Sequence, residues 1–351
     1  MAPLSRISRT ASRLLIAATA AAALALTGCA GTGTPEETSD GGGEATTAVN
    51  YQLSWLKITQ FGGYFAADAN GYFADEGIDA TFTAGGANIL AWQQITGGKA
   101  DIGDEDNTLL LQAIESGEDL VAIGTIFQKS PLAIMSLSDN PITSAADVSG
   151  KTIAFPDNGI DQLQSALEAN GVDLSTVEIV PAGADPTQLI TQQVDGYGGY
   201  ATAQGAALAT QGLDVEYLYL DDLGIPSYGN VIVTTREMLE SDRDTVVKFM
   251  TAAAKGYEWM NANPADGAAI VVDDVNPTGG LDVTTETETA RIQADLISSP
   301  TGVLRIDTDK MQDIIDALVE TGTLEATLDA GEIVDTSVLD DVYGGKTSLL
   351  D

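Results

Sequence analysis

Residues 63–83 read GYFAADANGYFADEGIDATFT and contain a helix, a helix stop and a strand in one short segment. The residues from about Gly63 onward predict a helix that stops at Asn70-Gly71, since the residue after a last helical turn favours a left-handed conformation. Residues 79–83 alternate in polarity and predict a strand. Another strand is predicted at residues 49–53. The chain therefore begins as strand, helix and strand, which is typical of an α/β fold with largely parallel sheets.

The alternation of strands and helices continues along the chain, with a break at Asn140-Pro141. Before the break we predict helices at 92–95 and 108–115 and strands at 100–103 and 120–125. After the break we predict strands at 152–155, 177–180, 215–220 and 230–234 and helices at 159–170, 186–194 and 203–210. The rest of the chain is mostly helical, and two stripes of apolar residues at helical spacing predict core faces: Val246, Met250, Ala253, Tyr257 and Met260, then Met311, Ile314, Ile315, Leu318 and Val319.

The chain beyond residue 48 is long for a single hydrophobic core and suits two lobes. We predict that residues 49–136 and 235–351 form lobe 1 and that residues 137–234 form lobe 2. The hinges between them are expected at 134–140 and 232–236. In sheets of this kind a ligand cleft lies where loops leave the carboxyl ends of the strands.

The first 28 residues have the composition of a secretion signal. They contain no Asp or Glu and carry Arg6, Arg9 and Arg13 ahead of a largely apolar run of thirteen residues at 14–26. A membrane-spanning helix needs about 20 apolar residues, so this shorter run favours a cleaved signal.

Residues 26–29, Leu-Thr-Gly-Cys, resemble a bacterial lipobox, and Cys29 is the only cysteine in the chain. No intramolecular disulfide is possible, so we expect Cys29 to be lipidated. Residues 29–48 are rich in Gly, Thr, Ser and acidic residues and predict a flexible tether. We therefore expect a protein held by lipid at the extracytoplasmic face of the bacterial cell membrane.

The chain is strongly acidic, with 52 Asp and Glu residues against 15 Lys and Arg residues. Three of the basic residues lie in the predicted signal, so the mature chain has 52 acidic and 12 basic residues and a net charge near −40. A charge of this sign argues against nucleic acid as a partner. We interpret the acidity as a solvated surface that keeps a secreted, monomeric protein soluble.

The residue types that most enzymes need are missing. The sequence has no histidine and no Gly-x-Ser-x-Gly motif, and its single cysteine is assigned to lipid. Residues 150–152 and 345–347 read Gly-Lys-Thr, but Ala145 and Asp340 stand where a phosphate-binding loop needs glycine. The acidic segment 101–107 lacks the central glycine and final Glu of a calcium loop. We expect no enzyme activity, no cofactor and no metal site.

Several motifs in the same order resemble the substrate-binding proteins of importers for thiamine precursors, nitrate, sulfonates and taurine. Residues 70–79 (NGYFADEGID) are similar to the family's helix end, residues 97–103 (GGKADIG) to a later turn, and residues 147–153 (DVSGKTI) to the start of its second half. Gly85-Gly86 resembles its paired-glycine loop. The resemblance covers roughly residues 50 to 265. It implies a type II periplasmic-binding-protein fold and an ATP-driven (ABC) importer, with its permease and ATPase, as the partner.

The resemblance extends to the branch that binds a pyrimidine precursor in thiamine salvage. Trp55 in the first loop, Phe127-Gln128 and residues 195–197 carry this likeness. A riboflavin-binding branch shares much of the pattern. The family also includes an enzyme that makes the thiamine pyrimidine from its own histidine and pyridoxal phosphate, which a chain without histidine cannot do in that way.

A flat heteroaromatic ligand needs aromatic faces for stacking and a few polar groups along its edge. The aromatic candidates for ligand contact lie near predicted strand ends or loops: Trp55, Phe61, Tyr64, Phe155, Tyr197, Tyr200 and Tyr228. The polar candidates lie where a strand ends or a helix begins: Asn88, Asp104, Asn107, Gln128, Asp157, Asn158 and Gln188. Each could instead belong to the core, a helix cap or a turn.

The positions of the basic residues bear on the charge of the ligand. All four arginines after the signal lie in the C-terminal helical region, so a neutral or cationic ligand is favoured. Lys57 and Lys129 keep a sulfonate, nitrate or taurine ligand open as alternatives. We expect the ligand to bridge the two lobes and to stabilise a closed state that the importer recognises.

Overall fold

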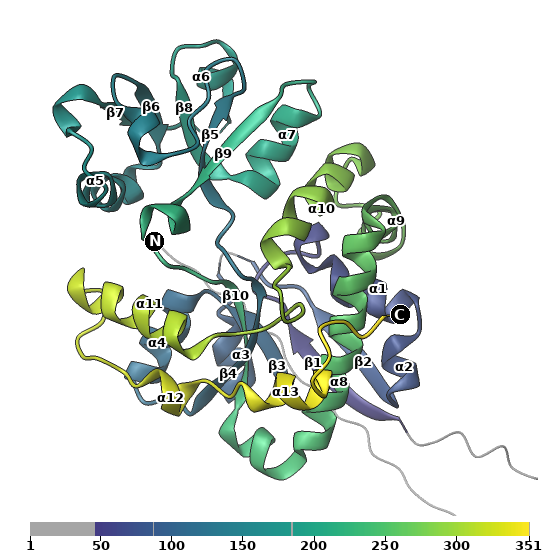
Figure 1. Ribbon diagram of the computed structural model, residues 1–351. Coiled ribbons are helices and arrows are strands. Elements are labelled where there is room, and N and C mark those ends of the chain that lie inside the picture. The colour runs from purple at the N-terminus through teal and green to yellow at the C-terminus, as the bar shows by residue number, and fades with distance from the viewer. Residues whose placement is uncertain (1–45, 87, 184, 351) are drawn as a thin grey trace, which may run out of the picture. The chain divides into compact units, whose positions relative to one another are not determined.

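The computed structural model describes residues 46–86, 88–183 and 185–350 and builds them around two five-stranded sheets (Figure 1). The predicted signal, the lipidation site at Cys29 and the tether up to residue 45 lie outside the described residues. In the described part of the chain, no helix is both long enough and apolar enough to cross a membrane.

The first sheet has the strand order β2-β1-β3-β10-β4. Its strands are β1 (Thr47–Gln52), β2 (Ile78–Thr83), β3 (Ile102–Glu105), β4 (Leu120–Phe127) and β10 (Gly229–Thr235). β1 is parallel to β2 and β3, whereas β10 is antiparallel to β3 and β4. The carboxyl ends of β1 to β4 and the amino end of β10 therefore share one edge, which we call the carboxyl edge.

The second sheet has the strand order β7-β6-β8-β5-β9. Its strands are β5 (Leu132–Leu137), β6 (Thr152–Phe155), β7 (Glu178–Pro181), β8 (Gly196–Tyr200) and β9 (Val215–Tyr219). β6 is parallel to β7 and β8, and β5 is antiparallel to β8 and β9. In each sheet the single antiparallel strand is the one that enters from the other sheet. The prediction of α/β architecture with largely parallel sheets is confirmed.

The predicted lobe boundaries are wrong by one strand at each crossing. β5, which was not predicted, begins at Leu132 in the second sheet, and β10 lies in the first sheet. The segments that connect the sheets are therefore 128–131 and 220–228, not the hinges predicted at 134–140 and 232–236. An apolar run such as 231–233 shows that a strand is buried, but not which sheet it joins.

Helices cover both sheets. Those of the first part are α1 (Gly62–Ala69), α2 (Tyr72–Asp75), α3 (Ala91–Thr96) and α4 (Asn107–Glu115). The second sheet carries α5 (Ile160–Ala169), α6 (Thr187–Ile190), the π-helix η5 (Ala201–Gly205) and α7 (Ala206–Ala209). The chain ends with α8 (Arg236–Ala262), α9 (Pro264–Ala269), α10 (Val283–Ile297), α11 (Thr308–Glu320), α12 (Ala330–Ile333) and α13 (Ser337–Tyr343). The mostly helical C-terminal region is confirmed, whereas the helix predicted at 186–194 is only the short α6.

The predicted stripe on α8 packs in the main hydrophobic core of the first sheet. Val246, Met250, Ala253 and Tyr257 are fully buried, and they pack in the same cluster as Tyr51 of β1 and Tyr64 of α1. On α11, Met311, Ile314 and Ile315 are buried in a second cluster, and Leu318 and Val319 pack against it. The helices thus fix the first sheet from both faces and leave its carboxyl edge to loops.

Candidate functional site

A polar network around the buried Asp104 joins three segments at the carboxyl edge of the first sheet. Asp104, near the end of β3, accepts hydrogen bonds from Ser54 Oγ at 2.5 Å and from Asn230 Nδ2 at 2.7 Å. Asn230 Nδ2 also lies 2.8 Å from Ser54 Oγ, and Gln60 Nε2 donates to Asn230 Oδ1 at 2.7 Å. We call Ser54, Gln60, Asp104 and Asn230 the polar network. It ties the loop after β1 to the start of β10.

Two backbone features allow these side chains to meet. Asn230 has a φ of 62°, in the left-handed region that Asn tolerates better than most residues. The paired glycines after β2 approach the loop after β1 closely, because Gly85 N donates to the Trp55 carbonyl at 2.8 Å. A Cβ atom on Gly85 would lie 2.2 Å from the Leu53 carbonyl oxygen, so a larger residue would push the two loops apart.

Within the part of the chain that the structure describes, Asp104 forms no ion pair with a lysine or arginine. The side chain is fully buried, and burial raises its pKa to about 7, although the hydrogen bonds from Ser54 and Asn230 favour the carboxylate. Neighbouring Glu105 is also buried and its pKa is raised by that burial. Glu105 accepts from Trp92 N at 3.3 Å and from Asp106 N at 3.1 Å, so it caps the start of α3. A chain this acidic thus carries two adjacent buried carboxyl groups at one strand end.

Several large apolar side chains are exposed near strand ends of the two sheets. Seven large hydrophobic residues are exposed in the described part of the chain, and five of them lie in or beside segments at strand ends. These five, which we call the apolar rim, are Trp55, Leu56, Ile89, Leu109 and Tyr200. Trp55 is 43% exposed and Tyr200 51%. Contiguous exposed apolar surface marks interaction sites, and these five residues are the candidates for such a surface at the strand ends.

Tyr200 belongs to the second sheet, but burial and the charge of Asp106, which follows β3 of the first sheet, raise its pKa. It is the last residue of β8, and its backbone N–H donates to Gln204 Oε1 at 2.9 Å. Burial of its hydroxyl end and the charge of Asp106 both raise its pKa. Asp106 is the N-cap of α4 and accepts from Thr108 N at 2.8 Å. Tyr200 of the second sheet thus lies within electrostatic reach of Asp106, which follows β3 of the first.

Five of the predicted aromatic contacts are core residues. Phe61, Tyr64, Phe155, Tyr197 and Tyr228 are all at most 2% exposed. The Tyr64 hydroxyl lies 2.7 Å from the Tyr51 hydroxyl, and the Tyr197 hydroxyl donates to the Gly183 carbonyl at 2.7 Å. A Cβ atom on Gly198 would lie 2.1 Å from the Phe155 ring, so this ring packs directly against the glycine. Of the seven predicted aromatic contacts, only Trp55 and Tyr200 are exposed.

The predicted polar contacts divide in the same way. Asn88 and Asp157 are exposed beside strand ends, and the side chain of Asn158 lies outside what the structure describes. Asn107 is buried against Ser227 Oγ at 2.9 Å, and Gln128 donates to the Arg305 carbonyl at 2.8 Å. Gln188 accepts from Gly183 N at 3.1 Å. Sequence reasoning missed Ser54 and Asn230, although both border predicted strands.

The arginines are occupied elsewhere. Each arginine of the described residues pairs with a carboxylate, in the pairs Arg236–Asp119, Arg243–Asp335, Arg291–Glu288 and Arg305–Asp340. Lys129 pairs with Asp222. Lys57 has no ion pair within the described part of the chain. The site therefore offers little positive charge to an anion.

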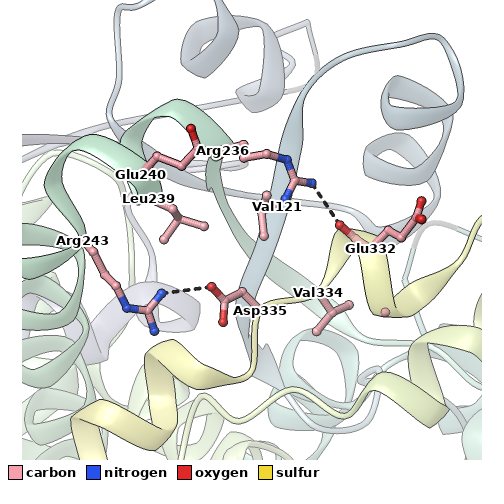
Figure 2. A pocket seen from close by; sticks show the side chains of 9 residues that line it. Val121, Arg236, Leu239, Glu240, Arg243, Glu332, Val334 and Asp335 are labelled. Carbon is pink, nitrogen blue, oxygen red and sulfur yellow. Dashed lines mark hydrogen bonds and ion pairs between the residues drawn. The ribbon is translucent and has the colours of Figure 1, made fainter.

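A separate hollow lies at the opposite edge of the first sheet (Figure 2). Val121, at the amino end of β4, lines it with Arg236 and Arg243 of α8. Arg236 Nη2 donates to the Glu332 carbonyl at 2.9 Å and Arg243 Nη1 to Asp335 at 3.0 Å, as the dashed lines show. Both arginines of this hollow are thus already bonded, and it shares no residue with the polar network or the apolar rim.

Several known proteins align with this chain, among them two binding proteins and an enzyme. The formylaminopyrimidine-binding protein of Halalkalibacterium halodurans is 24% identical over 65% of this chain and 71% of its own length. The riboflavin-binding protein RibY of Chloroflexus aurantiacus is 27% identical over 62% of this chain but only 63% of its own length. An enzyme, 4-amino-5-hydroxymethyl-2-methylpyrimidine phosphate synthase of Aspergillus parasiticus, is 22% identical over 65% of this chain and 71% of its own length.

Solved structures confirm the predicted type II two-lobed fold. The periplasmic aliphatic sulphonate binding protein SsuA of Escherichia coli is 17% identical to this chain, with a TM-score of 0.59 over 82% of this chain and 92% of that one. A family model described as NMT1/THI5 like matches residues 58–267, more than half of the chain. This chain belongs to the NMT1/THI5 like family.

Proposed function

We propose that this protein is the extracytoplasmic solute-binding component of an ATP-driven importer and that it binds a thiamine-related pyrimidine precursor or a similar heteroaromatic compound. The observation that carries this proposal is the exposed Trp55, which directly follows Ser54 of the polar network at an edge with little positive charge. Such a surface suits a flat ring that stacks on Trp55 and Tyr200 and offers polar atoms along its edge.

The contacts that we propose are fewer than those predicted from the sequence. Trp55 and Tyr200 would hold the faces of the ring, and Asn88 and Asp157 would reach its polar edge. Asp104 is buried and would act by fixing Ser54, which precedes Trp55. The ligand would contact side chains from both sheets and so stabilise one relative orientation of the lobes.

The charge of the site supports a neutral or cationic ligand over an anion. All the arginines of the described residues are paired, and Asp104 and Glu105 are buried close by. Among such ligands, pyrimidine binding in the Halalkalibacterium halodurans relative supports a pyrimidine precursor. Riboflavin binding in the Chloroflexus aurantiacus relative supports riboflavin as the alternative. A sulfonate, nitrate or taurine ligand would depend on Lys57.

The enzyme alternative has less support. One relative is a pyrimidine phosphate synthase, but this chain has no histidine and its one cysteine is assigned to lipid. We propose transport without chemical conversion, with lipidated Cys29 and the tether keeping the protein beside its permease.

Isothermal titration calorimetry of the purified chain tests this proposal. The titrants are 4-amino-5-hydroxymethyl-2-methylpyrimidine, its formylamino analogue, thiamine, riboflavin, taurine and nitrate, each followed by analysis of the mixture for new products. We expect saturable 1:1 binding of a pyrimidine or riboflavin, with no product. Tight binding of taurine or nitrate alone would contradict the charge argument, and turnover of a pyrimidine would favour the enzyme.

A further inference from the structure

Lys310, near the start of α11, contacts both segments that connect the two sheets. Its Nζ donates to the Gln128 carbonyl at 2.7 Å, in segment 128–131. The same Nζ lies 2.6 Å from Asp221 Oδ1 and 4.9 Å from the centre of the Tyr228 ring, both in segment 220–228. One ammonium group thus joins the two crossings to each other and to a helix of the first lobe.

This ion pair is better shielded than most in the chain. The side chains of Lys310 and Asp221 are 22% and 17% exposed, whereas those of Lys248 and Asp244 on α8 are 45% and 79% exposed. A shielded pair that also bonds a carbonyl and a ring is harder to replace by water than an exposed pair. Loss of the ammonium would leave the Asp221 carboxylate without its cation.

The chain just before Lys310 holds the same two crossings. Gln128 Nε2 donates to the Arg305 carbonyl at 2.8 Å, and Asp307 N donates to the Tyr228 hydroxyl at 2.9 Å. Asp307 is also the N-cap of α11, since its carboxylate accepts from Lys310 N at 2.9 Å. Residues 305–310 therefore form hydrogen bonds to both crossings, and the side chain of Lys310 contacts the two crossings at once.

We propose that Lys310 is a positioning residue of the binding cycle: by holding both crossings in one backbone arrangement, it limits how readily the two lobes change their relative orientation. The inference rests on the proposed function, in which closure over a solute is the working movement. The residues of a hinge must absorb the change in backbone angles. A cation bound to two hinge segments at once stabilises one set of those angles.

Distances between spin labels in the full chain without ligand test this inference. Labels are placed through Glu168→Cys on α5 and Asp313→Cys on α11, both exposed, with Cys29→Ser to keep the labelling specific. The variants are Lys310→Met, which keeps the aliphatic stem, Lys310→Arg, which keeps the cation, and Lys248→Met as the matched control. Lys248 pairs within α8 and touches neither crossing.

We expect Lys310→Met to broaden the distance distribution and to raise the population outside the native range roughly fivefold or more. Lys310→Arg should lie closer to the native chain, and Lys248→Met should match it. A Lys310→Met distribution equal to that of the control would overturn the proposal.

Hydrogen exchange with Asp221→Asn gives a second test if Lys310→Met does not fold. Peptides from both 128–131 and 220–228 should exchange faster, although the substitution lies in only one of them. Faster exchange confined to 220–228 would contradict the proposal that Lys310 holds both crossings together. Neither experiment uses a ligand, so a failure to bind pyrimidines would refute the proposed function without deciding the role of Lys310.

Discussion

The Thr289 hydroxyl donates a hydrogen bond of 2.8 Å to the backbone carbonyl of Thr202. Thr289 lies on α10, among the C-terminal helices, whereas Thr202 lies in η5, which directly follows β8 of the second sheet (Figure 1). This bond is therefore a contact between the lobes outside the two crossings. It is nearly buried, because Thr289 is only 8% exposed.

Thr289→Val should loosen this contact without unfolding the protein. Valine has nearly the same shape but cannot donate, so the Thr202 carbonyl loses a bond worth about 1 kcal/mol. We expect faster amide exchange in peptides covering η5, with a change of about 1 kcal/mol or less in the free energy of unfolding. Thr287→Val is the control, because that hydroxyl bonds only to the Val283 carbonyl of its own helix. Equal exchange in both variants would show that the bond does not hold η5.

Asp104→Asn should remove a pH dependence of stability. Burial raises the pKa of Asp104 to about 7 in the folded chain, above its ordinary value of 3.8. Between these values the folded state binds more protons than the unfolded state, so this group lowers the stability as pH rises from about 4 to 7. The cost above pH 7 is on the order of a few kcal/mol.

Urea unfolding at pH 5 and pH 8 measures this effect. The native chain should lose more free energy of unfolding between the two pH values than Asp104→Asn does. Asp101→Asn is a useful comparison, because Asp101 also bonds the first sheet, through Asn50 N at 2.7 Å, but is not fully buried. If native chain and Asp104→Asn respond equally to pH, Asp104 is ionised in the folded protein throughout this range.

The sequence predicted eight of the ten strands of the described residues, because each of these is a local pattern, and it missed β5 and β8. β6 was predicted at its observed bounds, Thr152–Phe155, and β2 within one residue of them. The lobe boundaries failed because sheet membership is a long-range property. β10 is an ordinary apolar strand in sequence, and only its pairing with β3 and β4 places it in the first sheet.

The candidate site was predicted less well for a related reason. An aromatic residue at a strand end can face solvent or the core, and sequence spacing does not distinguish the two. Trp55 proved exposed, whereas Tyr64 is buried with its hydroxyl against Tyr51. Asn230 could have been suspected, since an Asn beside a glycine at a strand start often takes a left-handed conformation. Its partners Ser54 and Asp104 lie far away in sequence and needed the fold.

Cys29→Ala should release the protein from the membrane. Lipidation requires the thiol, and the predicted tether contains almost no apolar residues that could replace the acyl chains. Fractionation of cells should find the native chain with membranes and the variant in the soluble extracytoplasmic fraction or unprocessed. Labelled palmitate should enter only the native chain. Membrane retention of processed Cys29→Ala would contradict the lipid anchor.

Trp55→Ala should weaken ligand binding far more than it weakens the fold. Trp55 is 43% exposed, so its truncation leaves no cavity in the core and should change the free energy of unfolding by about 1 kcal/mol or less. Loss of a stacking face should lower the affinity for an aminopyrimidine or riboflavin roughly tenfold or more, since ring contacts of this kind contribute about 1 kcal/mol beyond their buried area. Trp55→Phe, which keeps an aromatic face, should recover much of the affinity. Ile190→Ala is the matched control, because Ile190 is an exposed apolar residue of α6 outside the apolar rim. Calorimetry of the four proteins measures this effect. If Trp55→Ala and Ile190→Ala bind the same titrant as tightly as the native chain, the ligand does not stack on Trp55. The binding site then lies away from the loop that follows β1.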